Sequence, residues 1–165
     1  MVDATCILTA QQSAMKINRM AYEIVENTLQ EKKIILAAIP DRGVDIAQKL
    51  KAIIEQISSL QVHIISIEID KQNPIDARID PSFDPNNQYI ILVDDVADSG
   101  RTAMYALKPF LNALPKKIQL AVLVDRKHKK FPVTSDYIGI QVSSSLQENI
   151  RVDIDKKGHI QAFIN

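Results

Sequence analysis

The segment from Tyr89 to Thr102 constrains the fold of this chain most strongly. It begins with five consecutive large apolar or aromatic residues, Tyr89 to Val93. This run lacks the alternation of a strand with one wet face, so it predicts a central strand covered by helices on both sides. An apolar pattern at helical spacing follows, from Ala103 to Leu111. The order predicts a buried strand, a short loop and a helix, which together form the repeating unit of a parallel α/β sheet.

The polar residues between this strand and helix indicate a chemical function. Asp94 and Asp95 follow the strand directly, and adjacent carboxylates there must face solvent, a cation or hydroxyl donors. The loop and first helical residues that follow are small or charged: Asp98, Ser99, Gly100, Arg101 and Thr102. Backbone N–H groups in such a turn, with the positive end of the helix dipole, form a phosphate site. The acid pair and the phosphate loop together indicate a ligand with hydroxyl groups at one end and a phosphate at the other, that is, a sugar phosphate. The alternative, ordinary strand-end residues of any α/β protein, is less favoured because these residues occur together in this order.

The rest of the chain alternates between strand and helix patterns. A capping box at Thr9 and Gln12 begins a helix predicted to extend to about Glu31, whose outer charged face is interpreted as solvated. Further patterns predict a strand at 34–39, a helix from about 44, strands at 62–69 and 118–124, and a terminal hairpin at 150–154 and 160–164. Residues 1–165 are therefore expected to form a single α/β domain with a parallel, Rossmann-like sheet flanked by helices. The ligand belongs at the carboxyl ends of its strands.

Composition limits the cellular setting and the partners. Twenty basic and twenty acidic residues balance, so no global field draws the chain to nucleic acid or membrane. Cys6 is the only cysteine, which excludes an intrachain disulfide. No signal peptide is evident and the apolar runs are too short to span a bilayer, so a cytoplasmic location without membrane contact is expected.

Two further loops have the composition of binding segments. Asp41, Arg42 and Gly43 follow the strand predicted at 34–39, where backbone N–H groups and a guanidinium can hold an anion. The segment from Asp70 to Gln88 is polar and contains three prolines. A long irregular insertion in a small domain is often functional, and a lid is one common use.

The segment from Tyr89 to Thr102 resembles the phosphoribosyl-pyrophosphate (PRPP) motif of type I phosphoribosyltransferases, with mild departures at Ala97 and Ser99. The resemblance implies PRPP and a nucleobase as substrates, Mg²⁺ as cofactor, and a flexible hood formed by residues 70–88. It implies catalytic roles for Asp94, Asp95 and Asp98, of which Asp94 and Asp95 also serve the metal and the ribose hydroxyls. The 5-phosphate site would comprise Asp98, Ser99, Gly100, Arg101 and Thr102. The pyrophosphate site would comprise Asp41, Arg42, Gly43 and, from the hood, Lys71, with Arg78 as a further phosphate contact.

The last third of the chain resembles a narrower family. Val124-Asp125-Arg126, His128, Pro132 and Asp136-Tyr137-Ile138-Gly139 are similar to the bacterial pyrimidine-operon attenuation regulator, which is also a uracil phosphoribosyltransferase. This resemblance implies a homodimer or higher oligomer, and a base pocket formed by Ile138, Gly139, Ile140 and Gln141. Uracil is favoured as the base. A purine stays open because Asp98 is typical of purine enzymes, whereas Asp125 replaces the lysine of 6-oxopurine enzymes.

The basic run from Arg126 to Lys130 leaves a second function open. It fits a solvated face, an RNA-binding patch or an approach for a tetra-anionic substrate, and the sequence does not separate these three. A nucleotide-sensing, RNA-binding regulator is therefore the alternative to an enzyme.

Overall fold

A parallel sheet of five strands forms the centre of the computed structural model, which describes residues 4–143 and 148–165. Its strand order is β3-β2-β4-β5-β6, and each neighbouring pair is parallel. The strands are β2 (Lys33–Ala38), β3 (Gln61–Ser66), β4 (Tyr89–Ala97), β5 (Lys117–Arg126) and β6 (Tyr137–Val142). The apolar run Tyr89–Val93 thus lies in the central strand, β4, as predicted.

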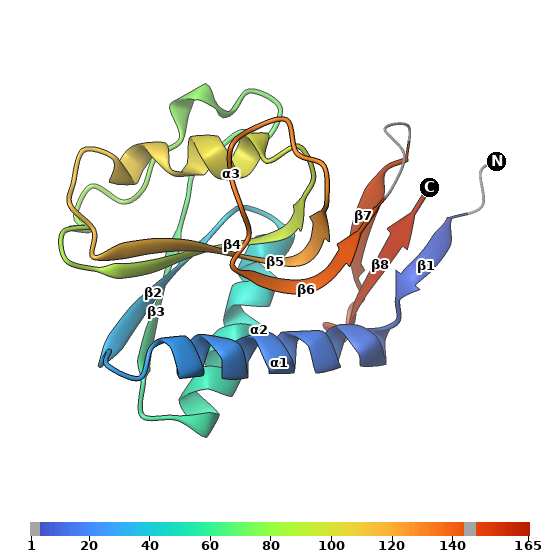
Figure 1. The fold of residues 1–165 in the computed structure, drawn as a ribbon, viewed down its shortest axis with the longest axis horizontal. Coiled ribbons are helices and arrows are strands. Elements are labelled where there is room, and N and C mark those ends of the chain that lie inside the picture. The colour runs from blue at the N-terminus through green and yellow to red at the C-terminus, as the bar shows by residue number, and fades with distance from the viewer. Residues whose placement is uncertain (1–3, 144–147) are drawn as a thin grey trace.

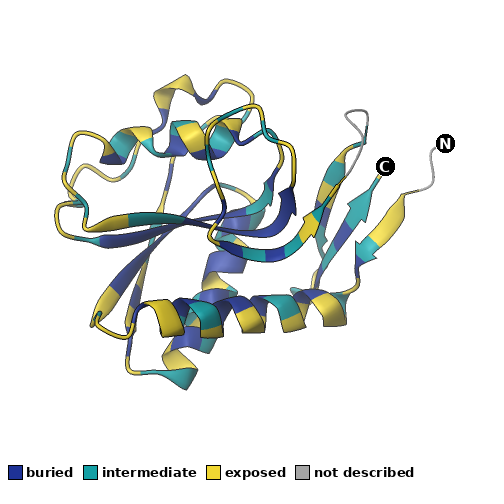
Figure 2. Ribbon diagram, in the orientation of Figure 1, coloured by how far each residue is buried: buried dark blue, intermediate teal, exposed yellow. Residues whose placement is uncertain are grey.

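Helices cover both faces of this sheet (Figure 1). Helices α1 (Ala10–Asn27) and α2 (Arg42–Ile57) pack on one face. The short α3 (Arg101–Ala106) and the 3₁₀ turns η1 (Pro74–Asp76) and η2 (Lys108–Phe110) lie on the other. Successive residues of β4 belong to different cores, since Val93 packs with α1 and α2 whereas Leu92 packs with Phe110. Figure 2 shows the resulting dark, buried centre of the sheet.

A smaller antiparallel sheet stands beside the end of β6 (Figure 1). Its order is β1-β8-β7, with β1 (Thr5–Leu8), β7 (Ile150–Ile154) and β8 (Ile160–Ile164). The terminal hairpin is confirmed. Strand β1 was not predicted, because four residues of mixed polarity at the start of a chain give too weak a signal for a strand.

The boundaries of two predicted helices differ from the sequence-based expectation. Helix α1 ends at Asn27, where the backbone N–H of the C-cap residue Thr28 bonds to the Val25 carbonyl, and Leu29 beyond it is exposed. Helix α3 ends at Ala106, since Pro109 disfavours an α-helical conformation at the preceding residue. Leu111, predicted on its buried face, is 69% exposed. Within the described part of the chain, none of the helices has the length and apolarity needed to cross a membrane.

Candidate active site

The acid pair lies at the carboxyl end of β4 and is held by a lysine of the predicted hood. Asp94 is buried and the side chain of Asp95 is only 14% exposed. Lys71 Nζ is 3.1 Å from Asp94 Oδ1 and 3.6 Å from Asp95 Oδ1. Asp94 Oδ1 also accepts a hydrogen bond from the Asp95 backbone N–H. A single, partly exposed lysine ammonium therefore lies against both carboxyl groups.

The ionisation of this cluster reflects its burial. Burial, followed by repulsion from Asp95, raises the pKa of Asp94 to about 8, and the attraction of Lys71 only partly opposes this. Burial alone would lower the pKa of Lys71, but the carboxylates of Asp94 and Asp95 outweigh it and raise that pKa. We conclude that Lys71 is a cation at neutral pH and that the acid pair retains a proton easily. A carboxyl cluster of this kind suits hydroxyl groups and an incoming cation.

The predicted phosphate loop forms a tight turn into α3. Gly100 has φ of +81°, a left-handed conformation that side chains other than glycine rarely adopt. A Cβ added there would lie 2.5 Å from Val133 Cγ2. The Ser99 carbonyl accepts from the backbone N–H groups of Lys130 and Phe131. The loop thus lines a hollow together with Asp94, and the segment after β5 packs against the loop.

The predicted pyrophosphate loop packs directly on β4. A Cβ added at Gly43 would lie 2.7 Å from the Val93 carbonyl oxygen and 3.3 Å from Asp94 Cα, so only glycine fits. Asp41 has φ of +67°, a strained conformation for a residue with a side chain. Arg42 Nη2 is 4.0 Å from Asp153 Oδ1 of β7. The structure therefore packs Gly43 of this loop against Asp94, whereas the side chain of Arg42 is directed to β7.

The predicted hood is docked against α3. Arg101 Nη2 donates to the Gln72 carbonyl at 2.9 Å, and Lys108 Nζ donates to the Ile75 carbonyl at 2.8 Å. The first contact places Lys71, the residue before Gln72, over the acid pair. Arg78, in contrast, lines a separate hollow with Glu68, Asp70, Asn73 and Asp76. Lys71 joins the site, whereas Arg78 does not.

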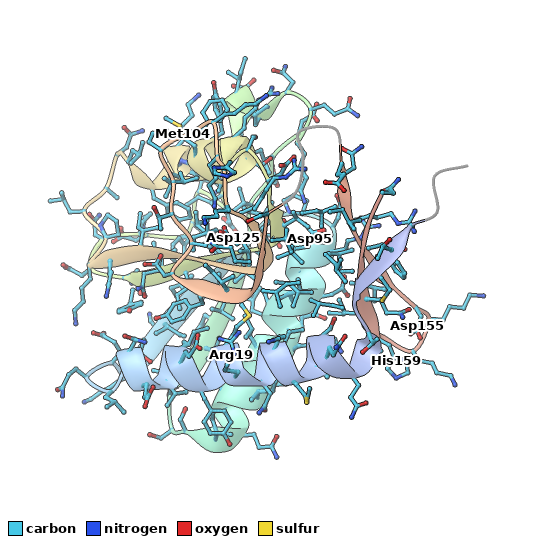
Figure 3. The ribbon with its side chains drawn as sticks, turned by 45° about the vertical axis from the view of Figure 1, so that its right-hand side comes forward. Arg19, Asp95, Met104, Asp125, Asp155 and His159 are labelled. Atoms are coloured by element: carbon cyan, nitrogen blue, oxygen red, sulfur yellow. The ribbon has the colours of Figure 1, made fainter. Side chains whose placement is uncertain are left out.

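The four residues predicted to bind the base, 138–141, lie in different surroundings in the structure. The carbonyls of Ile138 and Gly139 accept from Arg19 Nη2 of α1, at 2.7 and 2.8 Å (Figure 3 labels Arg19). Arg19 is therefore not simply part of a solvated face, as its helix pattern indicated. Gly139 is buried against the Leu123 backbone, and Ile140 packs against the core on the α1 and α2 face. Gln141 lies at the carboxyl edge and bonds to Asp125.

Two ion pairs whose basic partners are largely buried were not predicted from the sequence. Arg126, 9% exposed in its side chain, pairs with Asp98 and also donates to the Glu148 carbonyl. Lys129, 12% exposed, pairs with buried Asp125 at 2.6 Å. Both belong to the basic run that was interpreted as a possible surface patch. The sequence did contain a signal for these pairs, namely charged residues at the end of a buried strand. A charge at such a position stays inside the protein, and needs a partner there, unless the chain turns outward.

The comparisons with known proteins show the family of this chain. The phosphoribosyl transferase domain model matches residues 3–155, so the chain belongs to that family and is a PRPP-dependent phosphoribosyltransferase. Among its relatives is the bifunctional protein PyrR of Clostridium novyi, 36% identical over 160 residues that cover 89% of this chain and 90% of that protein. The PyrR of Bacillus pumilus is 35% identical over 162 residues, covering 91% and 90%.

Solved structures share the fold at low identity. A hypoxanthine-guanine phosphoribosyltransferase from Bacillus anthracis has a TM-score of 0.77 at 20% identity, covering 99% of this chain and 100% of that one. A hypoxanthine phosphoribosyltransferase from Trypanosoma cruzi has a TM-score of 0.78 at 14% identity, covering 96% and 95%. The predicted fold is thereby confirmed, including the parallel sheet and the additional antiparallel strands.

Proposed function

We propose that this protein transfers the 5-phosphoribosyl group of PRPP to a free nucleobase, with uracil favoured, and releases pyrophosphate and a nucleoside monophosphate. One observation carries the assignment of the site: the acid pair, the 98–102 loop and the glycine of the 41–43 loop meet at the end of a single strand, β4. This arrangement suits a ligand with hydroxyls between two phosphate groups. The relatives named PyrR support uracil, and the purine enzymes among the fold neighbours keep a 6-oxopurine as the alternative.

In this proposal the residues act by position and charge. The 98–102 loop holds the 5-phosphate, and Asp94 and Asp95 accept from the ribose hydroxyls, so the ribose is fixed. The bond from C1 to pyrophosphate breaks while the base nitrogen bonds to C1, and the proton of that nitrogen passes to the departing pyrophosphate. The carboxylates stabilise the positive charge that develops at C1. The 41–43 loop and Lys71 receive the departing pyrophosphate.

Mg²⁺ fits this site as a partner of the substrate. Among the residues that the structure describes, no three His, Cys, Asp or Glu side chains gather to form a metal cage. Asp94 and Asp95 provide the oxygen ligands that Mg²⁺ prefers, and this ion is usually bound by one or two carboxylates and substrate phosphates. When bound, it would neutralise charge on the pyrophosphate. The contact of Lys71 with both carboxyl groups supports a cation at this position.

Asp98 has a narrower role in this proposal than the sequence indicated. Its carboxylate pairs with the guanidinium of Arg126, a permanent cation that cannot give up its proton. Because this ion pair ties Asp98 to the end of β5, Asp98 is proposed to hold the phosphate loop in place and to contact the base as a hydrogen-bond acceptor.

A base panel tests the proposed function. Purified protein with PRPP and Mg²⁺ is given uracil, hypoxanthine, guanine, xanthine or adenine, and nucleoside monophosphate formation is measured by chromatography. We expect the highest kcat/KM with uracil. Turnover of hypoxanthine or guanine in preference to uracil would show that the base is a purine. No turnover of any base would refute the transfer reaction.

RNA binding is the second candidate function. The structure leaves fewer basic side chains on the surface of the 126–130 run than the sequence indicated. Arg126 and Lys129 are internal, whereas Lys127, His128 and Lys130 remain exposed on the segment after β5. The relatives' name, bifunctional, favours an additional activity. Titration of an RNA hairpin at low and high salt, with and without UMP, tests it. Binding that weakens with salt and responds to UMP would support the regulator, and no binding at low salt would remove it.

A further inference from the structure

The buried carboxylate of Asp125 organises the carboxyl end of β5. Asp125 is only 2% exposed, and three side chains, two from the connection between β5 and β6 and one from β6, donate to it. Lys129 Nζ lies 2.6 Å and Ser135 Oγ 2.7 Å from its Oδ1, and Gln141 Nε2 lies 3.0 Å from its Oδ2. The carboxylate is thus solvated by protein groups, as burial requires.

This contact fixes which way the Gln141 amide points. Because Asp125 is ion-paired with Lys129, it is a carboxylate and can only accept hydrogen bonds. The Gln141 amide must therefore turn its NH₂ group toward Asp125, since the opposite orientation would oppose two oxygens in a buried place. Gln141 Oε1 is consequently directed away from Asp125 and is left as the outward acceptor of an exposed side chain.

The position of Gln141 matches the place of a nucleobase. Ala97, Asp125 and Gln141 form one row across β4, β5 and β6, because Ala97 pairs with Asp125 and Asp125 with Gln141. The phosphate loop begins at Asp98, directly after this row. Neighbouring strands lie about 4.8 Å apart, so Gln141 is roughly 10 Å across the sheet from the start of that loop. This span is comparable to that of a nucleotide from its phosphate to its base. Figure 3 shows Asp95 and Asp125 at this same end of the sheet.

We propose that Asp125 is a specificity-determining positioning residue that presents Gln141 Oε1 as a hydrogen-bond acceptor to the nucleobase. The site then selects bases with a ring N–H at the edge that faces Gln141, which are the imide and lactam bases such as uracil and hypoxanthine. Cytosine and adenine carry an unprotonated ring nitrogen there, which would oppose the amide oxygen. This inference rests on the proposed function, because it assigns the base side of the same site.

Binding of nucleoside monophosphates tests this proposal without requiring turnover. Calorimetric titration of the full chain with UMP, CMP, IMP and AMP is expected to give at least about tenfold tighter binding of UMP over CMP, or of IMP over AMP, because a site that reads a hydrogen-bond donor rejects an analogue lacking it. In Asp125→Asn the amide at position 141 can turn either way, so this preference should shrink toward unity. Gln141→Leu should lose it as well, and as an exposed residue it can be replaced even if Asp125→Asn fails to fold.

Ser135→Ala provides the matched control. It removes another hydrogen bond to Asp125 but leaves the Gln141 contact and the Lys129 ion pair, so the preference should persist. Tighter binding of CMP or AMP, an unchanged preference in Gln141→Leu, or no binding of any of the four nucleotides would overturn the proposal. The transfer reaction is judged separately by turnover of PRPP in the wild-type protein, so the two claims fail on different measurements.

Discussion

The ammonium of Lys71 lies 3.1 Å from Asp94 Oδ1, so a residue of the docked hood contacts the acid pair of the central strand. The hood therefore contributes a cation to the candidate site. Because Arg101 holds the neighbouring Gln72 carbonyl, the phosphate loop and the acid pair are linked through the same segment.

Replacing Lys71 by Met should weaken PRPP binding selectively. Loss of a charge-assisted contact to pyrophosphate is worth about 1.5–3 kcal/mol, so the KM for PRPP should rise about tenfold or more while the KM for the base stays unchanged. Steady-state kinetics with each substrate varied in turn measures this. Lys156→Gln, an exposed lysine on the β7–β8 turn, is the control. Equal rises in both KM values would show that Lys71 acts only through the general fold.

The pH dependence of stability should reveal Asp94. Its pKa is raised from 3.8 to about 8 on folding, so between these values the folded state binds more protons than the unfolded state. Stability contributed by this group is therefore present at low pH and is lost as pH rises toward 8. Between pH 5 and pH 8 the free energy of unfolding of the wild type should fall by about 1–3 kcal/mol more than that of Asp94→Asn. Denaturant titrations at both pH values measure the difference, and parallel pH profiles for the two proteins would contradict it.

Gly43→Ala and Gly158→Ala form a matched pair of glycine substitutions. At Gly43 the added methyl group would lie 2.7 Å from the Val93 carbonyl oxygen, so the 41–43 loop must move. We expect a loss of about 1–3 kcal/mol in stability and a large rise in the KM for PRPP. Gly158, on the exposed hairpin turn with φ of +79°, has room for a methyl group but suffers backbone strain. Its substitution should cost about 1–2 kcal/mol and leave the kinetics unchanged. Similar kinetics in both variants would show that the loop does not contact PRPP.

The sequence predicts the sheet well because its signals are local. The unbroken run Tyr89–Val93 could only be a strand buried on both faces, and the capping box at Thr9 marks a helix start that the structure reproduces. The acid pair and the turn at Gly100 follow from residue type and order, so their proximity was predictable. The predicted C-terminal ends of α1 and α3 were wrong, because both helices stop earlier than their apolar patterns indicate, at Asn27 and at Ala106 ahead of Pro109.

The contacts that sequence reasoning missed are those between distant segments. Nothing local indicates that Arg19 of α1 reaches the backbone of β6, or that Arg126 and Lys129 fold inward to Asp98 and Asp125. A run of basic residues looks the same whether its charges face water or buried carboxylates. The different surroundings of residues 138–141 also depend on a contact between distant segments. The register of β6 with β5 decides which of its residues can face a ligand, and the sequence alone does not give that register.

The most direct measurement is pyrophosphate release from PRPP by the wild type and by the Asp94→Asn, Asp95→Asn double variant. It is followed with uracil and Mg²⁺, and circular dichroism checks that both proteins are folded. The account predicts base-dependent pyrophosphate release by the wild type and a loss of at least about a hundredfold in the double variant, because both carboxylates that face the developing charge at C1 are removed. Full activity in a folded double variant would contradict the assignment of β4 as the catalytic strand.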